Sequence, residues 1–115
     1  METLEHETRT NDGVTIIKLL GDKLNAANSK AFRDSLLPII SQGGKFVIDL
    51  QSLTFMDSSG VGALLSCLRQ VNEQGGDVKL CGVQKPVKVL FQLIRMSRVF
   101  DIYESAQEAE ESYNA

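Results

Sequence analysis

The residues of this chain best placed to do chemistry form one polar cluster, Asp57-Ser58-Ser59-Gly60. It follows an apolar stretch, residues 46–50, that is typical of a buried strand, and it precedes an amphipathic segment that is typical of a helix. A serine hydroxyl at the start of a helix is either a plain cap or a group that can be modified. Capping by Asp57 or Ser58 contributes about 1 kcal/mol, and composition alone favours this simpler interpretation.

No other set of residues offers a competing site. The one histidine, His6, has no second histidine or nearby cysteine with which to bind zinc, so we expect an exposed hairpin side chain. The cluster does not match the G-x-S-x-G elbow of a hydrolase, and no Lys-Ser/Thr pair follows Gly60 and Gly62 as in a phosphate-binding loop. Asp57 lacks the additional carboxylates of a phospho-accepting receiver domain. We therefore expect no catalytic residue, no metal site and no cofactor.

The composition is typical of one folded domain. The chain has 115 residues, of which 43% are hydrophobic, and a formal net charge of −3. This mildly acidic balance argues against nucleic acid as a partner and against electrostatic attachment to a membrane. No stretch is long enough to span a bilayer, and from the polar N-terminal residues we expect no signal peptide. We expect a cytoplasmic protein in which Cys67 and Cys81 are buried thiols.

Periodicity and turn residues predict alternating strands and helices. Asn11-Asp12-Gly13 indicates a turn between strands at 5–9 and 14–20, and the second strand is apolar enough to be covered on both faces. Such an alternation implies an α/β layered sheet with parallel crossovers. The further predicted elements are a helix at 32–40 capped by Asn25 or Asn28, a strand at 45–50, a helix at 61–71, a strand at 78–83, a helix at 86–94, a strand at 100–103, and a helix from Ser105 whose outer half, Glu108–Ala115, frays.

The block from Phe46 to Leu65, F-V-I-D-L-x-x-L-x-F-M-D-S-S-G-V-G-x-L-L, resembles the signature of the STAS domain of bacterial anti-sigma factor antagonists. The resemblance covers about residues 5–105, within one STAS domain that we place at 1–115. It implies an α/β fold with a mixed, mostly parallel sheet of four to five strands, an N-terminal hairpin and about four helices. It also takes in the hairpin, Leu20-Gly21-Asp22, Gly75-Gly76-Asp77-Val78, the helix at 87–91 and Val99-Phe100.

The resemblance implies a binding protein and not an enzyme. In that family the serine directly after the motif aspartate is phosphorylated, and the matching residue is Ser58. The implied partner is an anti-sigma factor that is also a serine kinase. The unphosphorylated antagonist binds it and frees the sigma factor, and a PP2C-type phosphatase later removes the phosphate. Ser59 is the nearest rival phosphorylation site, and family position alone favours Ser58.

The expected partner surface gathers around the same cluster. For Met56 we favour an exposed contact over a core position, and the two motif glycines either allow close approach of a partner or pack tightly inside. Family members commonly carry a Gly-Glu-Leu-Asp-like stretch after the second strand. Here Lys23 stands as an insertion, and the neutral Asn25 replaces the usual aspartate, which removes one charge. The expected contact residues are Gly21, Asp22, Asn25, Met56, Asp57, Ser58, Ser59, Gly60 and Gly62.

Two alternatives stay open at this point. In the first alternative, the chain is a STAS scaffold subunit of a larger assembly, such as a lipid transporter or a signalling module with a non-transcriptional output. The serine is then only a cap or a contact. The second alternative is an enzyme such as a weak nucleotide hydrolase, which the lack of a phosphate-binding loop, a metal cluster and an obvious general base disfavours.

Overall fold

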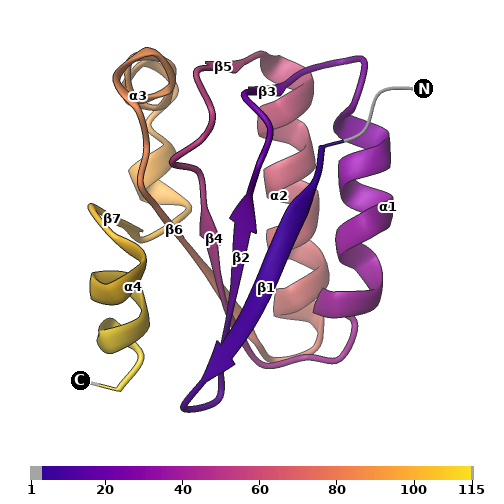
Figure 1. The fold of residues 1–115 in the computed structure, drawn as a ribbon, viewed down its shortest axis with the longest axis vertical. Helices are drawn as coiled ribbons and strands as arrows, with labels where there is room; N and C mark the ends of the chain where they lie inside the picture. Colours follow the sequence, from indigo (N-terminus) through magenta and orange to yellow (C-terminus); the bar gives the residue numbers. More distant parts are fainter. Residues whose placement is uncertain (1–3, 115) are drawn as a thin grey trace.

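The computed structural model describes residues 4–114 and has a five-stranded sheet at its centre (Figure 1). Its strands are β1 (His6–Asn11), β2 (Val14–Leu19), β4 (Lys45–Asp49), β6 (Asp77–Cys81) and β7 (Ile102–Tyr103). They lie in the order β1-β2-β4-β6-β7, with β1 antiparallel to β2 and every other pair parallel. This mixed, mostly parallel sheet with an N-terminal hairpin confirms the predicted fold class.

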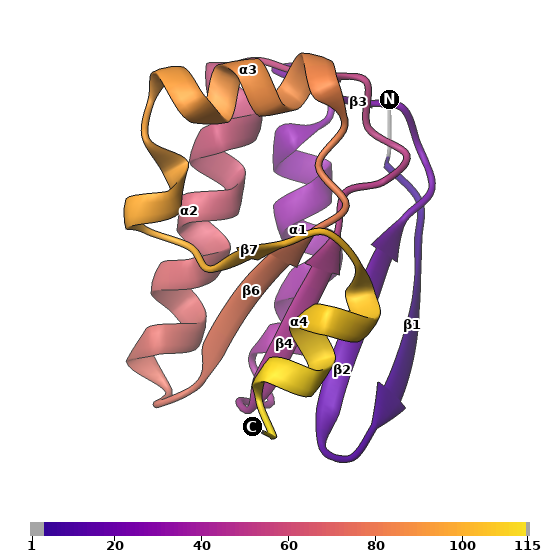
Figure 2. The same ribbon diagram turned by 90° about the vertical axis from the view of Figure 1, so that its left-hand side faces the viewer.

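The helices cover the sheet on both faces. They are α1 (Ser29–Ile40), α2 (Ser58–Glu73), α3 (Lys85–Leu93) and α4 (Ala106–Ser112), with a single 3-10 turn, η1 (Met96–Arg98), after α3. Figure 1 shows α1 and α2 on one face of the sheet and α4 on the other. Figure 2 shows that α3 lies across the end at which the parallel strands finish. The four helices match the predicted number.

The turn between β1 and β2 follows from two residues. Asp12 and Gly13 have φ values of 50° and 80°, and two successive positive φ angles are typical of the type I′ turn that suits a two-residue hairpin. The register places Asn11 directly opposite Val14. The prediction from Asn11-Asp12-Gly13 is therefore confirmed.

The central strands are buried on both faces, as predicted for β2. Ile17 and Ile48 belong to the larger hydrophobic cluster, on the side of α1 and α2. Ile16 and Val47 belong to a smaller cluster on the side of α4. Neighbouring side chains of a strand point to opposite faces, so each strand supplies both clusters. Most of both faces is filled with apolar side chains, and the buried polar exceptions among these strands are Asp49 and Lys79.

The C-terminal helix does not fray as predicted. Within the segment Glu108–Ala115, of which Ala115 lies outside the described residues, Tyr113 donates its hydroxyl to the carbonyl oxygen of Phe46 at 2.8 Å. The buried Lys79 donates to Ser112 Oγ at 2.7 Å, and its Nζ lies 4.0 Å from the centre of the Tyr113 ring. The prediction was wrong because it rested on the pattern of hydrophobic residues. The contacts that hold this helix to the sheet are made by polar side chains, which that pattern leaves out.

One small element was missed. β3 (Lys23–Leu24) and β5 (Phe55–Met56) pair in parallel as a separate two-stranded sheet. Strands of two residues are too short to show the alternation on which a sequence prediction depends. This small sheet nevertheless joins the loop after β2 to the segment that leads into α2.

Candidate functional site

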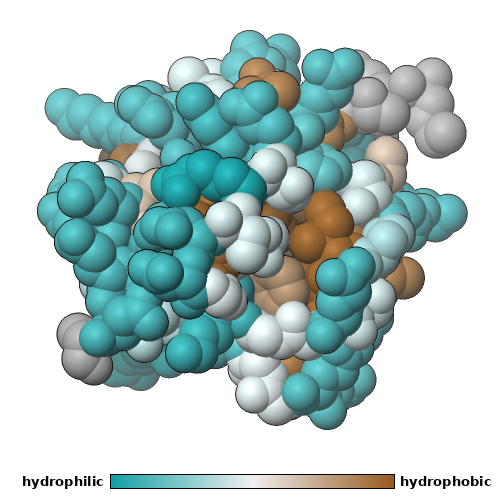
Figure 3. Space-filling model, turned by 60° about the horizontal axis from the view of Figure 1, so that its bottom comes forward, coloured by the Kyte–Doolittle hydropathy of each residue, from teal (hydrophilic) through white to brown (hydrophobic). Residues whose placement is uncertain are grey.

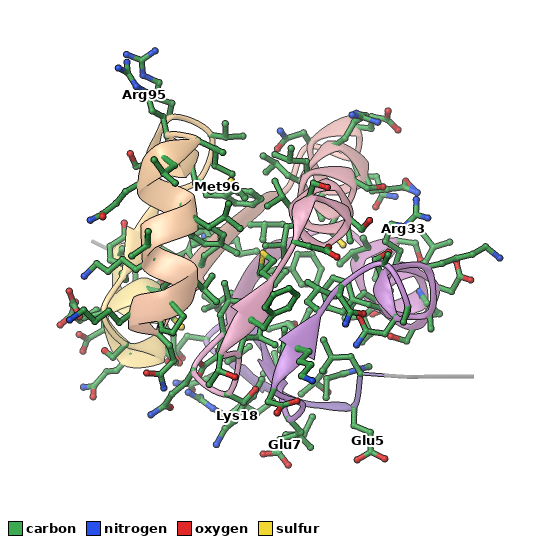
Figure 4. All side chains as sticks on the ribbon, turned by 90° about the horizontal axis from the view of Figure 1, so that it is seen from above. Glu5, Glu7, Lys18, Arg33, Arg95 and Met96 are labelled. Carbon is green, nitrogen blue, oxygen red and sulfur yellow. The ribbon has the colours of Figure 1, made fainter. Side chains whose placement is uncertain are left out.

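The polar cluster lies at the end of the sheet where the parallel strands finish, and Figure 4 views the molecule from this end. The loops after β2 and β4 both reach it, and the β3–β5 pairing sets Lys23 opposite Phe55 and Leu24 opposite Met56. The two loops from which contact residues were predicted are thus brought side by side.

The opposite end of the molecule is different. Figure 3 shows it from the side of the β1–β2 turn, where a mostly hydrophilic surface surrounds one hollow with apolar atoms.

Asp57 caps α2 and ties it to the neighbouring loop. Its backbone is extended, and its Oδ1 accepts the N–H of Gly60 at 3.1 Å. Its Oδ2 accepts the N–H of Ala26, also at 3.1 Å. A carboxylate suits this position because the first N–H groups of a helix have no partner inside the helix and create a positive potential. One side chain therefore joins the start of α2 to a loop that lies 31 residues earlier.

Ser58 is the first residue of α2 and is exposed. Within residues 4–114 its hydroxyl makes no hydrogen bond, and the capping bond comes from Asp57. Ser59, the rival site, is half-buried. The structure thus separates the two interpretations of the cluster, because Asp57 is the cap and Ser58 presents a free hydroxyl at the surface.

The two glycines of the motif have different surroundings. A methyl group on the buried Gly60 would lie 2.5 Å from the carbonyl oxygen of Leu24 and 2.7 Å from Cγ of Met56. A methyl group on Gly62 would have no atom within 4 Å, and this residue is exposed. Gly60 is therefore needed for the internal packing of α2 on β3. Gly62 is not needed for packing and lies at the open surface of α2.

Met56 is not the exposed contact that we expected. Its side chain is only 7% exposed and belongs to the larger hydrophobic cluster. Its place in β5 points it inward beneath Gly60, and its neighbour Phe55, which points the other way, is 48% exposed. Leu20, which directly follows β2 at the same end of the sheet, is 46% exposed. Neither apolar residue was predicted as a contact, because the alternation that separates Phe55 from Met56 spans only the two residues of β5 and is too short to read from the sequence.

The loop before α1 is held by asparagines. Asn28, which is 5% exposed, donates from Nδ2 to the carbonyl oxygen of Lys23 at 2.8 Å and accepts the N–H of Asn25 at 3.0 Å. Asn25 is half-buried, and its Oδ1 accepts the N–H of Ala27 at 3.0 Å. Asn28 precedes the first residue of α1, as predicted for a cap, but its side chain does not bond to a helix N–H. Both asparagines therefore fix the conformation of the loop to which Asp57 is hydrogen-bonded.

The preceding residues of this loop are also fixed by the backbone. The carbonyl oxygen of the exposed Asp22 accepts the N–H groups of Thr54 at 2.8 Å and Phe55 at 3.2 Å. The hydroxyl of Ser52 lies 2.5 Å from the carbonyl oxygen of Gly21. The carboxylate of Asp22 thus stands on an anchored backbone, at the same end of the sheet as Ser58.

The remaining reactive side chains do not form a second site. Burial raises the pKa of Cys67 to about 11 and, with the nearby carboxylate of Asp49, that of Cys81 to about 12. Both thiols are free and buried, as predicted, and stay protonated near neutral pH. His6 is half-buried and not fully exposed as expected. Residues 4–114 contain no cluster of side chains able to hold a metal ion, and none of their helices is long and apolar enough to cross a membrane.

Comparison with known proteins agrees with the resemblance seen in the sequence. The family model of the STAS domain matches residues 5–109. The anti-sigma F factor antagonist of Paenibacillus polymyxa is 32% identical over 104 residues, which cover 89% of this chain and 88% of that protein. Among solved structures, an anti-sigma-factor antagonist (STAS) domain protein from Planctomyces limnophilus superposes with a TM-score of 0.85 at 22% identity, covering 99% of this chain and 100% of that one.

A second solved structure shares the fold. The Bacillus cell fate determinant SpoIIAA, described in its phosphorylated form, superposes with a TM-score of 0.68 at 21% identity and covers 96% of this chain and 98% of that chain. At this level of identity the likeness shows a common fold. A protein with this fold is therefore known to carry a phosphate.

Proposed function

The chain belongs to the STAS domain family, and we propose that it acts as an anti-sigma factor antagonist whose binding is switched by phosphorylation of Ser58. The unphosphorylated protein binds an anti-sigma factor and so frees a sigma factor for transcription. The same anti-sigma factor is a serine kinase that phosphorylates Ser58, and the complex then separates. A PP2C-type phosphatase removes the phosphate and restores the binding form.

The observation that carries this proposal is the free hydroxyl of Ser58 beside an aspartate that already caps the helix. Because Asp57 satisfies the N–H of Gly60, the hydroxyl of Ser58 can change chemically without uncapping α2. A phosphate there would also be close to the first N–H groups of a 16-residue helix, and helix N-termini favour anions. Phosphorylation is therefore expected to leave the fold intact.

The same phosphate would weaken a docked complex. It adds about −1.5 to −2 charges next to Asp57 and at the same end of the sheet as Asp22. The exposed Phe55 and Leu20 give this end of the molecule apolar area that a partner can cover, and a phosphate in such an interface must lose its hydration. A loss of about 1.4 kcal/mol of binding free energy lowers the affinity tenfold, so a few kcal/mol are sufficient for release.

The proposed contact surface follows from exposure. Met56 and Gly60 are excluded because they are buried, and Phe55 and Leu20 are added. The remaining members are those predicted from the sequence, namely Gly21, Asp22, Asn25, Asp57, Ser58, Ser59 and Gly62. In this account the protein is a binding module, and Ser58 is a substrate of its partner.

The test measures binding to the anti-sigma factor encoded in the same genome. Wild type and Ser58→Ala should bind with similar Kd by calorimetry, and Ser58→Asp should bind at least tenfold more weakly. Ser58→Ala should take up no phosphate from the kinase and ATP, while the matched variant Ser59→Ala should take up phosphate normally. Retained incorporation in Ser58→Ala would move the site to Ser59 or elsewhere. Lack of binding by every variant would favour a scaffold role.

A further inference from the structure

A second surface of the molecule, formed by α3 and the turn after it, combines exposed apolar side chains with cations. We call it the α3 surface. Its apolar members are 45% to 77% exposed, although the chain buries most of its large hydrophobic residues. The members are Val89, Leu93, Ile94 and Val99, with the cations Lys85, Lys88, Arg95 and Arg98. Exposed apolar residues that are contiguous and rimmed by charge are typical of an interaction site.

The charge of this surface is one-sided. Residues 83–100 contain four cations and no acidic residue, in a chain with a formal net charge of −3. Within the part of the chain that the structure describes, the salt bridges are Arg9 with Glu110 and Lys30 with Asp34, so none of the four cations is in a salt bridge. The α3 surface is therefore a basic region on an acidic protein.

The backbone at Arg95 turns this side chain toward the solvent. Arg95 has φ 57° and ψ 49°, a left-handed conformation that a side chain with a Cβ disfavours. Figure 4 shows the result, with Arg95 pointing away from the molecule and its neighbour Met96 pointing inward. Met96 is 2% exposed, so the turn buries one side chain and projects the other into solvent.

A groove lies along one side of α3, between this helix and the segments that carry Val83, Ser97 and Ile102. One hollow of about 270 Å³ is lined by Val83, Lys88, Phe91, Gln92, Ser97 and Ile102. An adjoining hollow of about 450 Å³ shares three of these residues and adds Lys85 and Val89. The floor is largely apolar and the rim carries two lysines, a combination that accepts an apolar side chain and favours negative charge around it.

We propose that the α3 surface docks an acidic segment of another protein, which inserts an apolar side chain into the groove and places carboxylates against Lys85, Lys88 and Arg95. An anionic membrane fits less well because the rest of the chain is acidic and because a concave groove suits a side chain. A symmetric contact with a second copy would bring the same four cations against one another. This proposal goes beyond the Ser58 switch and does not require it.

The experiment is an NMR titration of the isotope-labelled full chain with two synthetic helical peptides. Both carry leucines at helical spacing, and their remaining positions are glutamate in one peptide and lysine in the other. The glutamate peptide should shift the backbone signals of residues 83–102, and the lysine peptide should not. Lys88→Glu should weaken binding at least tenfold. Lys30→Glu, which makes the same change of charge on α1, should not weaken it.

Further arms separate the other occupants. Leu93→Ser removes the most exposed apolar residue of the surface and should weaken peptide binding without lowering Tm. Ser58→Asp should bind the peptide like wild type, so that the result is independent of the switch. Absence of shifts at up to about 1 mM peptide would overturn the proposal. Lys88-dependent binding to phosphatidylglycerol vesicles in place of the peptide would make the surface a membrane contact, and Leu93-dependent dimerisation in sedimentation would make it a contact between copies.

Discussion

α2 and α4 begin with the same kind of bond and differ in what that bond reaches. In α2, Asp57 accepts the N–H of Gly60 at 3.1 Å, and in α4, Ser105 accepts the N–H of Glu108 at 3.2 Å. The hydroxyl of Ser105 is used within its own helix. Asp57 has a second oxygen, and that oxygen bonds to Ala26 in a distant loop.

This difference shows why a cap alone does not make a site. At α4 the first turn contains Glu108, an acidic residue that already balances the helix N-terminus. At α2 the carboxylate comes from the cap itself, Asp57, and the first turn offers the exposed Ser58. The two helix starts therefore differ in the exposed hydroxyl of Ser58 and in the bond to the distant loop, and both carry one negative side chain. The bond to the loop means that any change at Ser58 takes place beside residues of two segments.

The largest effect is expected at the residue whose N–H is capped. In α2 this residue is the buried Gly60, and in α4 it is the exposed Glu108. Gly60→Ala should lower the free energy of unfolding by about 3 kcal/mol, because the added methyl group meets the carbonyl oxygen of Leu24. Thermal unfolding measures this. Gly62→Ala is the matched control and should raise Tm slightly, since its methyl group meets open space and alanine favours a helix. Equal effects at the two glycines would contradict the packing described.

Removal of the shared carboxylate should have the next largest effect. Asp57→Ala loses the cap and frees the loop at Ala26, so we expect a loss of about 2 kcal/mol in the free energy of unfolding. Hydrogen exchange should rise both in the first turn of α2 and in residues 25–28. Faster exchange in α2 alone would show that the bond to the loop contributes nothing.

Alkaline pH should test two buried thiols, one on α2 and one on the strand beneath α4. Cys67 lies on α2 and Cys81 lies under α4, and burial raises both pKa values above the ordinary value of 9.0. Between pH 9 and about 11 the unfolded chain loses these protons while the folded chain keeps them, so stability falls as pH rises. By pH 10 each thiol should cost about 1 kcal/mol in denaturant unfolding. Cys67→Ala should reduce the slope, and an unchanged slope would contradict its burial.

The local cap of α4 should have a smaller effect. Ser105→Ala loses one exposed hydrogen bond and should cost about 1 kcal/mol or less. Partner binding and phosphate uptake should stay at wild-type levels, which calorimetry and radiolabel incorporation can check. A loss of partner binding in this variant would show that the two helix starts are not functionally separate.

The smallest effect on stability is expected at Ser58 itself. Ser58→Ala should change the free energy of unfolding by less than about 0.5 kcal/mol, because the hydroxyl is exposed and Asp57 supplies the cap. Urea unfolding of this variant beside Ser105→Ala gives the comparison directly. A cost of about 1 kcal/mol at Ser58 would restore the interpretation of this residue as a cap.

Much of the fold was predictable because long apolar patterns and turn residues determine it. The hairpin followed from Asn11-Asp12-Gly13, and the burial of β2 on both faces followed from its continuous apolar run. Three helices were predicted from the spacing of apolar residues, and the C-terminal helix from the capping pattern that begins at Ser105. What the pattern did not predict were the polar contacts. The anchoring of α4 through Lys79 and Tyr113 depends on groups that meet only in the folded protein.

The site was predictable in part for the same reason. The sequence indicated that a cap stands at the start of α2 but left open whether Asp57 or Ser58 provides it. Only the geometry shows that Asp57 uses both oxygens. Met56 is buried and Phe55 is exposed because the two residues point to opposite sides of the two-residue strand β5. Its alternation is too short to read from the sequence.

Peptide mapping by mass spectrometry would show whether Ser58 is the modified residue, as proposed. The protein is taken from its native cells, and also incubated with the candidate anti-sigma factor kinase and ATP. We expect a gain of one phosphate on the peptide that contains Ser58, localised to Ser58 and not to Ser59. A protein that carries no phosphate in any growth condition and with any cognate kinase would contradict it, and would leave Ser58 as an exposed residue of a scaffold.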